Sequence, residues 1–201
     1  MIQTSLTDVA FRKRIVKLKE FLIDIMKPSI REYLHYVNPD EVESWQYNCC
    51  RQTSLITNWY LRQWLLNNKS GYKEIQSWVG KFRDVIAGHI VLYDHAWIYC
   101  VHEDPRKNLL IDIARNHKPS MFAFTPVNEY PRNYPGYEYM VCFEKKRLNE
   151  EMLWEYSEHF TGKTIKEIIP KLSRYMQQQS VAKPVRKLRQ RPIPALQYID
   201  P

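Results

Sequence analysis

RDVIAGHIVLYDHAWIYCVHEDPRKNLLIDIA, residues 83–114, is the stretch of this sequence that decides the fold class. Three runs rich in β-branched and aromatic residues, at 83–93, 95–101 and 109–114, each predict a strand. The last two runs are separated by HEDPRKN, whose Asp-Pro and Asn are typical of a reversing loop. We therefore expect neighbouring antiparallel strands in this part of the chain.

Helical patterns precede these strands. Apolar residues recur every three or four positions from Thr7 to about Met26, which predicts an amphipathic helix, and Pro28 is expected to kink or restart it. A second helix is expected over 50–66, ending in the sequence NNKSG. Short helices are expected to start at Glu41 and to cover 72–79.

The pattern changes again after the strands. The Pro-rich passage 124–137 is expected to form an ordered loop packed by its own tyrosines, and 136–143 a further strand. Helical patterns return at 147–160 and at 163–176, with Pro170 interrupting the second. Helices, then strands, then helices favour an α+β fold in which helices cover an antiparallel sheet.

The composition is that of a globular chain. Its 201 residues are 44% hydrophobic and 13% aromatic, which offers enough apolar surface to build a core. Only 5 residues are Gly against 12 Pro, and neither GxGxxG nor GxxxxGK[ST] occurs. The sequence therefore argues against the common nucleotide-binding loops.

The net charge of +8 is unevenly distributed. Five basic residues fall between 181 and 201 among four prolines: Lys183, Arg186, Lys187, Arg189 and Arg191. We interpret 181–201 as a basic, Pro-containing C-terminal arm, either a peripheral extension or a docking segment for an acidic partner. Residues 1–180 are only mildly basic, so the sequence does not favour nucleic acid as a partner.

The sequence indicates neither export nor a membrane anchor. The N-terminal residues mix charged and apolar positions without a secretory signal, and no run of about 18 uncharged apolar residues occurs. Of the four cysteines only Cys49 and Cys50 are adjacent, and no CxxC pair or typical disulfide framework is present. We therefore expect a cytoplasmic protein in which Cys100 and Cys142 are buried in strands.

Three residues with complementary chemistry lie on different predicted elements. Cys50 opens the central helix, His95 opens a strand and Asp112 lies within the next strand. The positive end of a helix and a neighbouring imidazolium both stabilise a thiolate, the reactive form of cysteine. An imidazole can take the thiol proton and return it to a leaving amine, while a carboxylate fixes the tautomer of the ring. Paired antiparallel strands can hold two such side chains next to each other.

The helix sequence CRQTSLITNWYLRQWLL resembles the nucleophile helix of the transglutaminase-like superfamily, within the wider papain-like fold group. In that family a cysteine starts the helix, a small residue follows one turn later and a basic residue lies near its end. Cys50, Ser54 and Arg62 hold these places. Downstream, FRDVIAGHI and DHAWIYCVHEDPRKNLLIDIA resemble the family's strands with its histidine and aspartate. The separations, 45 residues from Cys50 to His95 and 17 from His95 to Asp112, are ordinary for these enzymes.

The resemblance implies a fold and a role for each residue. The fold would be papain/transglutaminase-like, with the nucleophile helix packed on a small antiparallel sheet and additional N- and C-terminal helices. Cys50 would be the nucleophile, with Cys49 as the alternative, His95 the general base and then acid, and Asp112 the orienting residue. The backbone N–H of Cys50 and, by residue type, the side chain of Gln46 are candidate oxyanion donors. This chemistry needs no cofactor.

Each of the three residues also has a structural interpretation. Cys50 would then be a buried core cysteine. His95 would be a histidine of an aromatic cluster, hydrogen-bonded to backbone. Asp112 would be a strand carboxylate paired with Arg83 or Arg115. Their order, spacing and predicted elements favour the catalytic interpretation, and Asp112 contributes because a carboxylate in an apolar strand needs a specific partner.

A metal site is the main competing interpretation of site chemistry. Its candidate ligands fall within thirty residues of one another: His89, His95, Cys100, His102 and His117. His95 and Cys100 are five positions apart and so face opposite sides of a regular strand, and no recognised zinc spacing occurs. We therefore expect no metal.

Two functions of different classes remain as hypotheses. The first is a cysteine-dependent acyl-transfer enzyme that attacks a peptide or glutamine-type amide of a protein or peptide substrate through a thioester. Water as acceptor would make it a protease or deamidase, and an amine would make it a transglutaminase. The second is a noncatalytic binding protein on the same scaffold, which uses the basic arm to hold nucleic acid or an acidic partner. The resemblance, over residues 46–115, favours the enzyme, with 1–180 as one catalytic domain.

Overall fold

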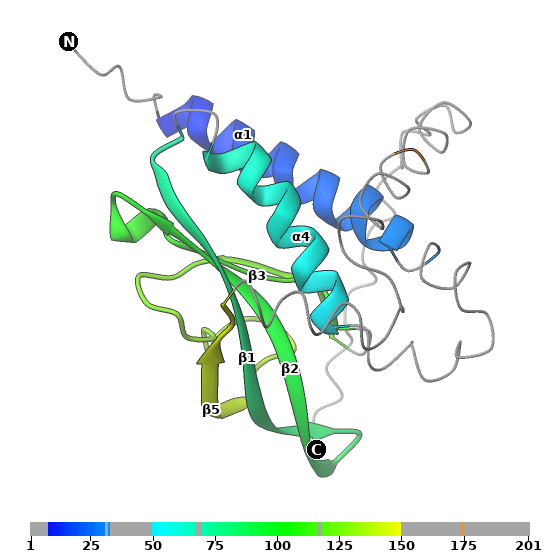
Figure 1. The fold of residues 1–201 in the computed structure, drawn as a ribbon. Helices are drawn as coiled ribbons and strands as arrows, with labels where there is room; N and C mark the ends of the chain where they lie inside the picture. Colours follow the sequence, from blue (N-terminus) through cyan, green and yellow to red (C-terminus); the bar gives the residue numbers. More distant parts are fainter. Residues whose placement is uncertain are drawn as a thin grey trace, which may run out of the picture.

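The computed structural model describes residues 8–30, 32, 50–66, 70–115, 118–149 and 174. These residues form a mixed α+β fold in which a five-stranded antiparallel sheet carries helices on one face (Figure 1). No helix in this part of the chain is long and apolar enough to cross a membrane. Three predictions fall outside it: the helix at Glu41, the helices after residue 149 apart from the helical Arg174, and the arm 181–201.

The N-terminal helix is built on one apolar stripe. α1 (Asp8–Glu20) continues through a π-helical segment, η1 (Phe21–Met26), and remains helical to Ile30. The buried stripe consists of Phe11, Ile15, Leu18, Leu22, Met26 and Ile30. Its spacing of three and four residues confirms the predicted amphipathic helix from residue 8 onwards. Ile25, which the pattern placed in the stripe, is exposed, because the wider π turn keeps every fourth residue on the buried side.

The irregularity expected at Pro28 lies one turn earlier. Proline has no N–H, and in an α-helix its ring clashes with the carbonyl group four residues before it. The π-helical segment ends at Met26, and residues 27–30 are α-helical again. Pro28 is therefore accommodated by a local distortion and does not end the helix.

α4 (Cys50–Leu65) lies beside α1 and against β1 and β2, which confirms the second predicted helix (Figure 1). Nη2 of Arg14 donates to the backbone oxygen of Trp64 over 2.9 Å, and the rings of Phe21 and Trp64 stack with centroids 5.8 Å apart. Residues 52–58 are all buried, although five of them are polar: Gln52, Thr53, Ser54, Thr57 and Asn58. The first half of α4 is therefore enclosed on every side.

A long hairpin forms the centre of the sheet. β1 (Tyr72–Ile86) pairs with β2 (His89–His102), and the connecting Ala87 and Gly88 have φ of 51° and 82°. A two-residue turn with positive φ at both positions matches the right-handed twist of the strands. The single strand predicted over 83–93 is therefore wrong, because this turn divides it. The run 95–101 is confirmed as part of β2.

The short helix predicted over 72–79 is also wrong. This segment is the first half of β1 and pairs with β2 along its length. Its sequence lacks a strict alternation of polar and apolar residues because both faces are covered: Ile75 and Ser77 are buried on one, and Gln76 and Trp78 are half-buried on the other. Pairing with β2 thus outweighs the local sequence pattern.

The remaining strands extend the sheet on both sides. They are β3 (Leu109–Asp112), β4 (Met121–Phe124) and β5 (Val141–Arg147), and the sheet order is β4-β3-β2-β1-β5. The predicted reversing loop contains a 3-10 turn, η4 (Pro105–Lys107), and is confirmed. The strand expected over 109–114 ends at Asp112, and the one expected over 136–143 begins only at Val141.

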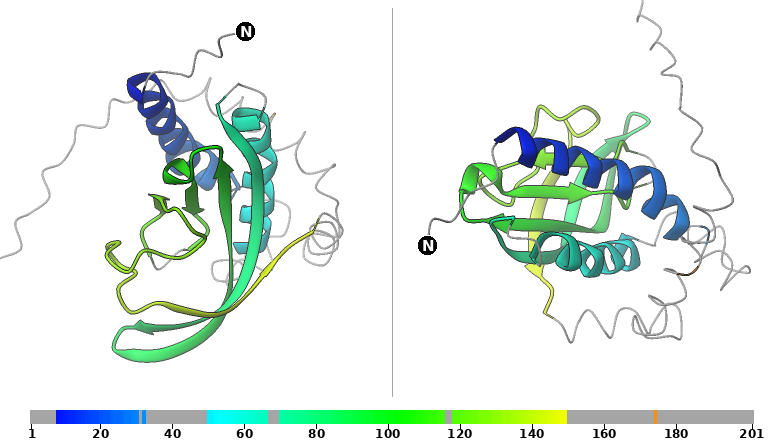
Figure 2. Two further views of the ribbon diagram at one scale, coloured as in Figure 1. Left: turned by 90° about the vertical axis from the view of Figure 1, so that its left-hand side faces the viewer. Right: turned by 90° about the horizontal axis from the view of Figure 1, so that it is seen from above.

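The two faces of the sheet are covered differently (Figure 2). Apolar residues of α1 and α4 pack on Ile98 and Ile111, on what we call the helix face. The opposite side, the loop face, carries Phe82 and Trp97 and is covered by the loop 125–140. Stacked and edge-to-face tyrosines pack this loop, as the sequence predicts.

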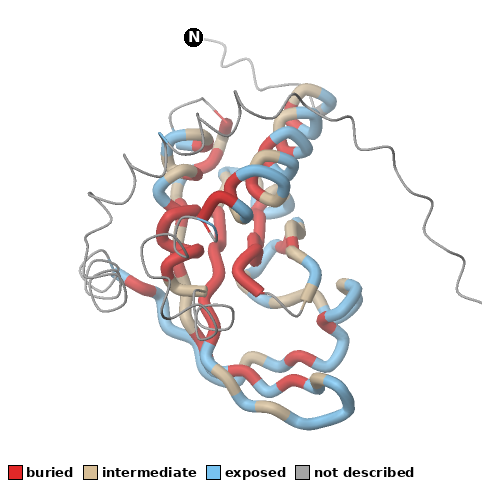
Figure 3. Tube along the Cα trace, turned by 90° about the vertical axis from the view of Figure 1, so that its right-hand side faces the viewer, coloured by how far each residue is buried: buried red, intermediate tan, exposed pale blue. Residues whose placement is uncertain are grey.

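Burial falls towards the tip of the hairpin (Figure 3). Ile90 and Leu92 are 72% and 70% exposed, whereas every residue from His95 to Cys100 is buried. His95 therefore lies at the point where β2 enters the core.

Candidate functional site

His95 and Asp112 are in direct contact. Nε2 of His95 lies 2.9 Å from both Oδ1 and Oδ2 of Asp112. In the ladder, Ile98 pairs with Ile111. Extending this register by one residue places Asp112 opposite Trp97, two positions from His95 on the same face. The contact therefore runs diagonally across β2 and β3, within the reach of long side chains.

Gly80 lies opposite His95 in β1. A Cβ atom at this glycine would lie 2.6 Å from the backbone oxygen of Glu144 and 3.0 Å from Cη2 of Trp97. The missing side chain therefore lets β5 and the indole ring pack closely beside the histidine.

The carboxyl group of Asp112 is buried, and its charged neighbours favour the ionised form. Burial alone raises the pKa of Asp112, but the charges and hydrogen bonds of His95 and Arg115 outweigh burial and hold that pKa below its ordinary value. An ionised carboxylate only accepts hydrogen bonds, so Nε2 of His95 carries the proton in this contact. Nδ1 is then the ring nitrogen that can exchange a proton with another group.

The structural and catalytic interpretations of these residues coexist. Asp112 pairs with Arg115, whose Nε donates to Oδ2 over 2.8 Å, and at the same time it binds His95. Arg83, the other partner considered for Asp112, is exposed. His95 also lies edge-on to Phe82, with ring centroids 6.0 Å apart. A structural ion pair and an aromatic cluster thus surround the histidine and carboxylate that a triad would use.

Cys50 is the first residue of α4 and is half-buried, and it forms no disulfide with another described cysteine. The next residue, Arg51, pairs with Asp94, with Nη2 3.7 Å from Oδ2. Asp94 directly precedes His95, so the start of α4 lies beside the part of β2 that carries the imidazole. Successive residues of a strand point to opposite faces, so Asp94 lies on the helix face and His95 on the loop face.

Other predicted site residues fall outside the described chain. Gln46, the candidate oxyanion donor, and Cys49, the alternative nucleophile, are among them. Gln52, which no sequence motif marks, is buried in the first turn of α4, and within the described structure neither of its amide atoms has a hydrogen-bond partner. A buried amide without partners is destabilising, so the fold alone does not explain the role of Gln52, two residues after Cys50.

Those candidate metal ligands that lie within the described residues do not converge. No group of three or more His, Cys, Asp and Glu side chains in the described part of the chain could hold a metal ion. His95 and Cys100 lie on opposite faces of the sheet. Nε2 of His102 donates to the backbone oxygen of Ser70 over 3.0 Å, so that ring is fixed by the loop before β1. His117 is outside the described residues.

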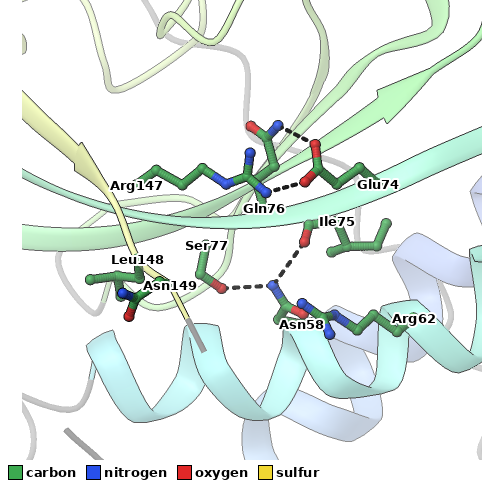
Figure 4. A pocket seen from close by; sticks show the side chains of 9 residues that line it. All are labelled: Asn58, Arg62, Glu74, Ile75, Gln76, Ser77, Arg147, Leu148 and Asn149. Atoms are coloured by element: carbon green, nitrogen blue, oxygen red, sulfur yellow. Dashed lines mark hydrogen bonds and ion pairs between the residues drawn. The ribbon is translucent and has the colours of Figure 1, made fainter. Parts of the chain in front are cut away.

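A polar cavity of about 420 Å³ lies where α4, β1 and the end of β5 meet (Figure 4). Its lining residues are Asn58, Arg62, Glu74, Ile75, Gln76, Ser77, Arg147, Leu148 and Asn149. Nδ2 of Asn58 donates to Oγ of Ser77 over 2.7 Å, and Arg147 pairs with Glu74. The cavity contains neither Cys50 nor the His95–Asp112 pair, so it is separate from the candidate catalytic residues.

No protein-family model, curated protein or solved structure matches the chain. The resemblance to the transglutaminase-like superfamily therefore rests on the motif residues themselves.

Proposed function

We propose that this protein is a cysteine-dependent acyl-transfer enzyme of the transglutaminase-like, papain-related type, acting on peptide or glutamine-type amides. The observation that carries the proposal is the buried 2.9 Å contact between His95 and Asp112, on a strand whose Asp94 pairs with Arg51 in the helix that begins at Cys50. A carboxylate that holds Nε2 keeps Nδ1 as the proton-exchanging nitrogen, and an imidazole fixed by a carboxylate in this way can activate a thiol.

The proposed reaction forms a thioester on Cys50. The thiol proton passes to Nδ1 of His95, and the sulfur attacks the amide carbonyl carbon. Backbone N–H groups at the start of α4 donate to the resulting oxyanion. The C–N bond breaks as His95 returns the proton to the leaving nitrogen. Water or an amine then gives a proton to His95, attacks the thioester and releases the acyl group, and His95 reprotonates the thiolate.

The proposed meeting point of thiol and imidazole is the edge of β2. His95 faces the loop side, whereas α4 packs on the helix face, so the two groups have to meet around the strand. β3 ends at Asp112, and β2 continues beyond it towards the hairpin tip. The Arg51–Asp94 pair, 3.7 Å long, joins the start of α4 to the helix face of β2, one residue before His95.

An acyl-trapping experiment tests the proposal without knowledge of the natural substrate. Incubation with an activated acyl ester, followed by intact-mass and peptide mass spectrometry, is expected to find one acyl group on Cys50. Cys50→Ser and His95→Gln remove it, and Cys49→Ser, the matched control, retains it. Acylation that persists in Cys50→Ser, or that is equal in wild type and His95→Gln, contradicts the proposal.

The acceptor is identified in a second step. Glutamine-containing peptides are offered with and without a primary amine, and the products are read as ammonia, cleaved peptide or amine adduct. Ammonia alone indicates a deamidase, cleavage a protease and an adduct a transglutaminase.

A further inference from the structure

Arg115 is a buried cation in direct contact with Asp112. It lies three residues after Asp112, is 3% exposed, and its Nε donates to Oδ2 of Asp112 over 2.8 Å. A buried guanidinium is strongly destabilising unless its charge and its donors are matched by nearby groups. The groups that contact Arg115 therefore have to stabilise its charge.

Four aromatic rings surround the guanidinium and form what we call the aromatic box. Cζ of Arg115 lies 5.0 Å from the ring centroid of Phe82 and 5.1 Å from that of Tyr93. The rings of Tyr130 and Tyr137 are each 5.7 Å away. Aromatic faces attract a desolvated cation. Because these rings come from β1, β2 and the loop 125–140, the box fixes the guanidinium from three parts of the fold.

The far end of the guanidinium is tied to a second carboxylate. Nη1 of Arg115 donates to the hydroxyl of Tyr93, which donates to Oδ2 of Asp84 over 2.9 Å. Nζ of Lys118 lies 2.8 Å from the same oxygen. Arg115 is therefore held at both ends, by Asp112 through Nε and by Tyr93 through Nη1, and its plane cannot turn without breaking these contacts.

The two oxygens of Asp112 are not equivalent. Oδ2 accepts from Arg115 Nε and also from the hydroxyl of Tyr130 over 3.0 Å. Burial and the nearby Asp112 carboxylate raise the pKa of Tyr130 well above its ordinary value, so the phenol stays protonated and donates. Oδ2 also lies 2.9 Å from Nε2 of His95, as Oδ1 does. A carboxylate oxygen has two lone pairs, so Oδ2 has one more donor within reach than it can fully accept. Oδ1, which among the described residues contacts only His95, is left as the principal acceptor for Nε2.

We propose that Arg115 and Tyr130 are positioning residues, which fix Oδ2 of Asp112. Oδ1 then takes the Nε2 proton of His95, and the imidazole presents Nδ1 for reaction. The effect on the ring rests on the contacts alone, whereas its consequence for catalysis rests on the proposed function. A salt bridge of purely structural value would stabilise the fold but would not hold His95 in one tautomer, and this difference makes the proposal testable.

Nitrogen NMR of the full-length protein with labelled histidine reads the tautomer of His95 directly, with His95→Gln used to assign its signals. In the wild type the Nε2–H form is expected to dominate at pH values where the ring is neutral. Tyr130→Phe and Arg115→Lys are expected to give a mixture of tautomers. Tyr134→Phe is the matched control, because its hydroxyl donates to the backbone oxygen of Ser120 and not to Asp112. An unchanged His95 tautomer in folded Tyr130→Phe and Arg115→Lys overturns the proposal.

Steady-state kinetics of the same variants provide a second test, independent of the tautomer measurement. If the proposed acyl transfer holds, Tyr130→Phe and Arg115→Lys lower kcat by about 10- to 100-fold and leave KM within about twofold, as loss of an orienting partner does. A tautomer shift in a protein that forms no acyl-enzyme supports the positioning of His95 and contradicts the proposed function. An unshifted tautomer in an active enzyme supports the function and overturns the positioning role.

Discussion

Arg51 and Asp94 join the first turn of α4 to the residue that precedes His95, with Nη2 and Oδ2 3.7 Å apart. Their side chains are 25% and 59% exposed, so the pair contributes less than about 1 kcal/mol to stability. Its importance is positional, because it links the helix that begins at Cys50 to the strand that carries the imidazole.

Reversing one charge of this pair is expected to slow acylation much more than it destabilises the fold. In Arg51→Glu we expect a change of under about 1 kcal/mol in the free energy of unfolding and a loss of about 10- to 100-fold in the acylation rate of Cys50, because a small misplacement of reacting groups is costly. The double variant Arg51→Glu/Asp94→Arg restores the opposite charges and part of the rate. Stopped-flow acylation and urea unfolding measure the two effects.

Lys81→Glu is the control for that experiment. Lys81 of β1 pairs with Glu144 of β5 over 2.9 Å, and both side chains are more than half exposed. Breaking this pair is expected to leave the acylation rate unchanged. An equal loss of rate in Lys81→Glu and Arg51→Glu would show that surface charge, and not the position of α4, controls the reaction.

Removing the charge of Asp112 is expected to destabilise the protein by about 3–5 kcal/mol, because Asp112→Asn leaves the buried Arg115 without its carboxylate partner. The double variant Asp112→Asn/Arg115→Met removes both charges and should recover a large part of this loss. Thermal or urea unfolding of the single and double variants tests the coupling. Additive effects of the two substitutions would mean that the pair is not energetically linked.

Stability is expected to fall at acid pH in part through Asp84. Burial raises the pKa of Asp84, but the hydrogen bonds from Lys118, Tyr93 and the Val85 N–H hold it below the ordinary 3.8. A carboxyl group with a depressed folded-state pKa stabilises the fold above its unfolded-state pKa, and this contribution is lost as the pH falls through the folded-state pKa. The free energy of unfolding should therefore decrease from about pH 4 downwards.

Asp84→Asn isolates this contribution from that of Asp112, whose pKa is depressed in the same direction. The variant is expected to be less stable than wild type at neutral pH and to lose less stability on acidification. Urea unfolding between about pH 7 and about pH 2 measures both slopes. Parallel curves for the two proteins would show that Asp84 is not stabilised by its partners.

Gly80→Ala is expected to destabilise the hairpin beside His95 by about 1–3 kcal/mol, as overpacking does. The new Cβ would lie 2.6 Å from the backbone oxygen of Glu144, which cannot move without displacing β5 from β1. Shortening the nearby Cys142 to Ala should not rescue the variant, because the backbone contact remains. Urea unfolding of the single and double variants measures this, and full rescue would assign the clash to the Cys142 side chain.

The sequence predicted α1 and α4 more reliably than the long strands. The stripe from Phe11 to Met26 has the period of an amphipathic helix, and this local signal needs no partner. The first half of β1 carries no such signal, because its residues are covered on both faces by elements distant in sequence. The Ala87-Gly88 turn is visible in the sequence, but the apolar residues on both sides of it look like one continuous strand.

The contact between His95 and Asp112 was predictable from order and spacing, whereas its surroundings were not. The four rings around Arg115 come from positions 82, 93, 130 and 137, which no spacing rule connects. The sequence offers His95 and Arg115 as alternative partners of Asp112, because the order of residues does not show that both can reach one carboxylate. Three-dimensional packing supplies this information.

The pH dependence of Cys50 alkylation tests the central claim most directly. An ordinary thiol with a pKa near 8.5 is only about 0.3% thiolate at pH 6, and therefore reacts slowly with iodoacetamide there. Cys142 provides an internal reference, because burial raises its thiol pKa.

In the wild type we expect Cys50, located by peptide mass mapping, to be alkylated at pH 6 at least about tenfold faster than an ordinary thiol, and to lose this advantage in His95→Gln. If Cys50 reacts at pH 6 no faster than an ordinary thiol and His95→Gln changes nothing, the thiol and the imidazole do not act together and the account is contradicted.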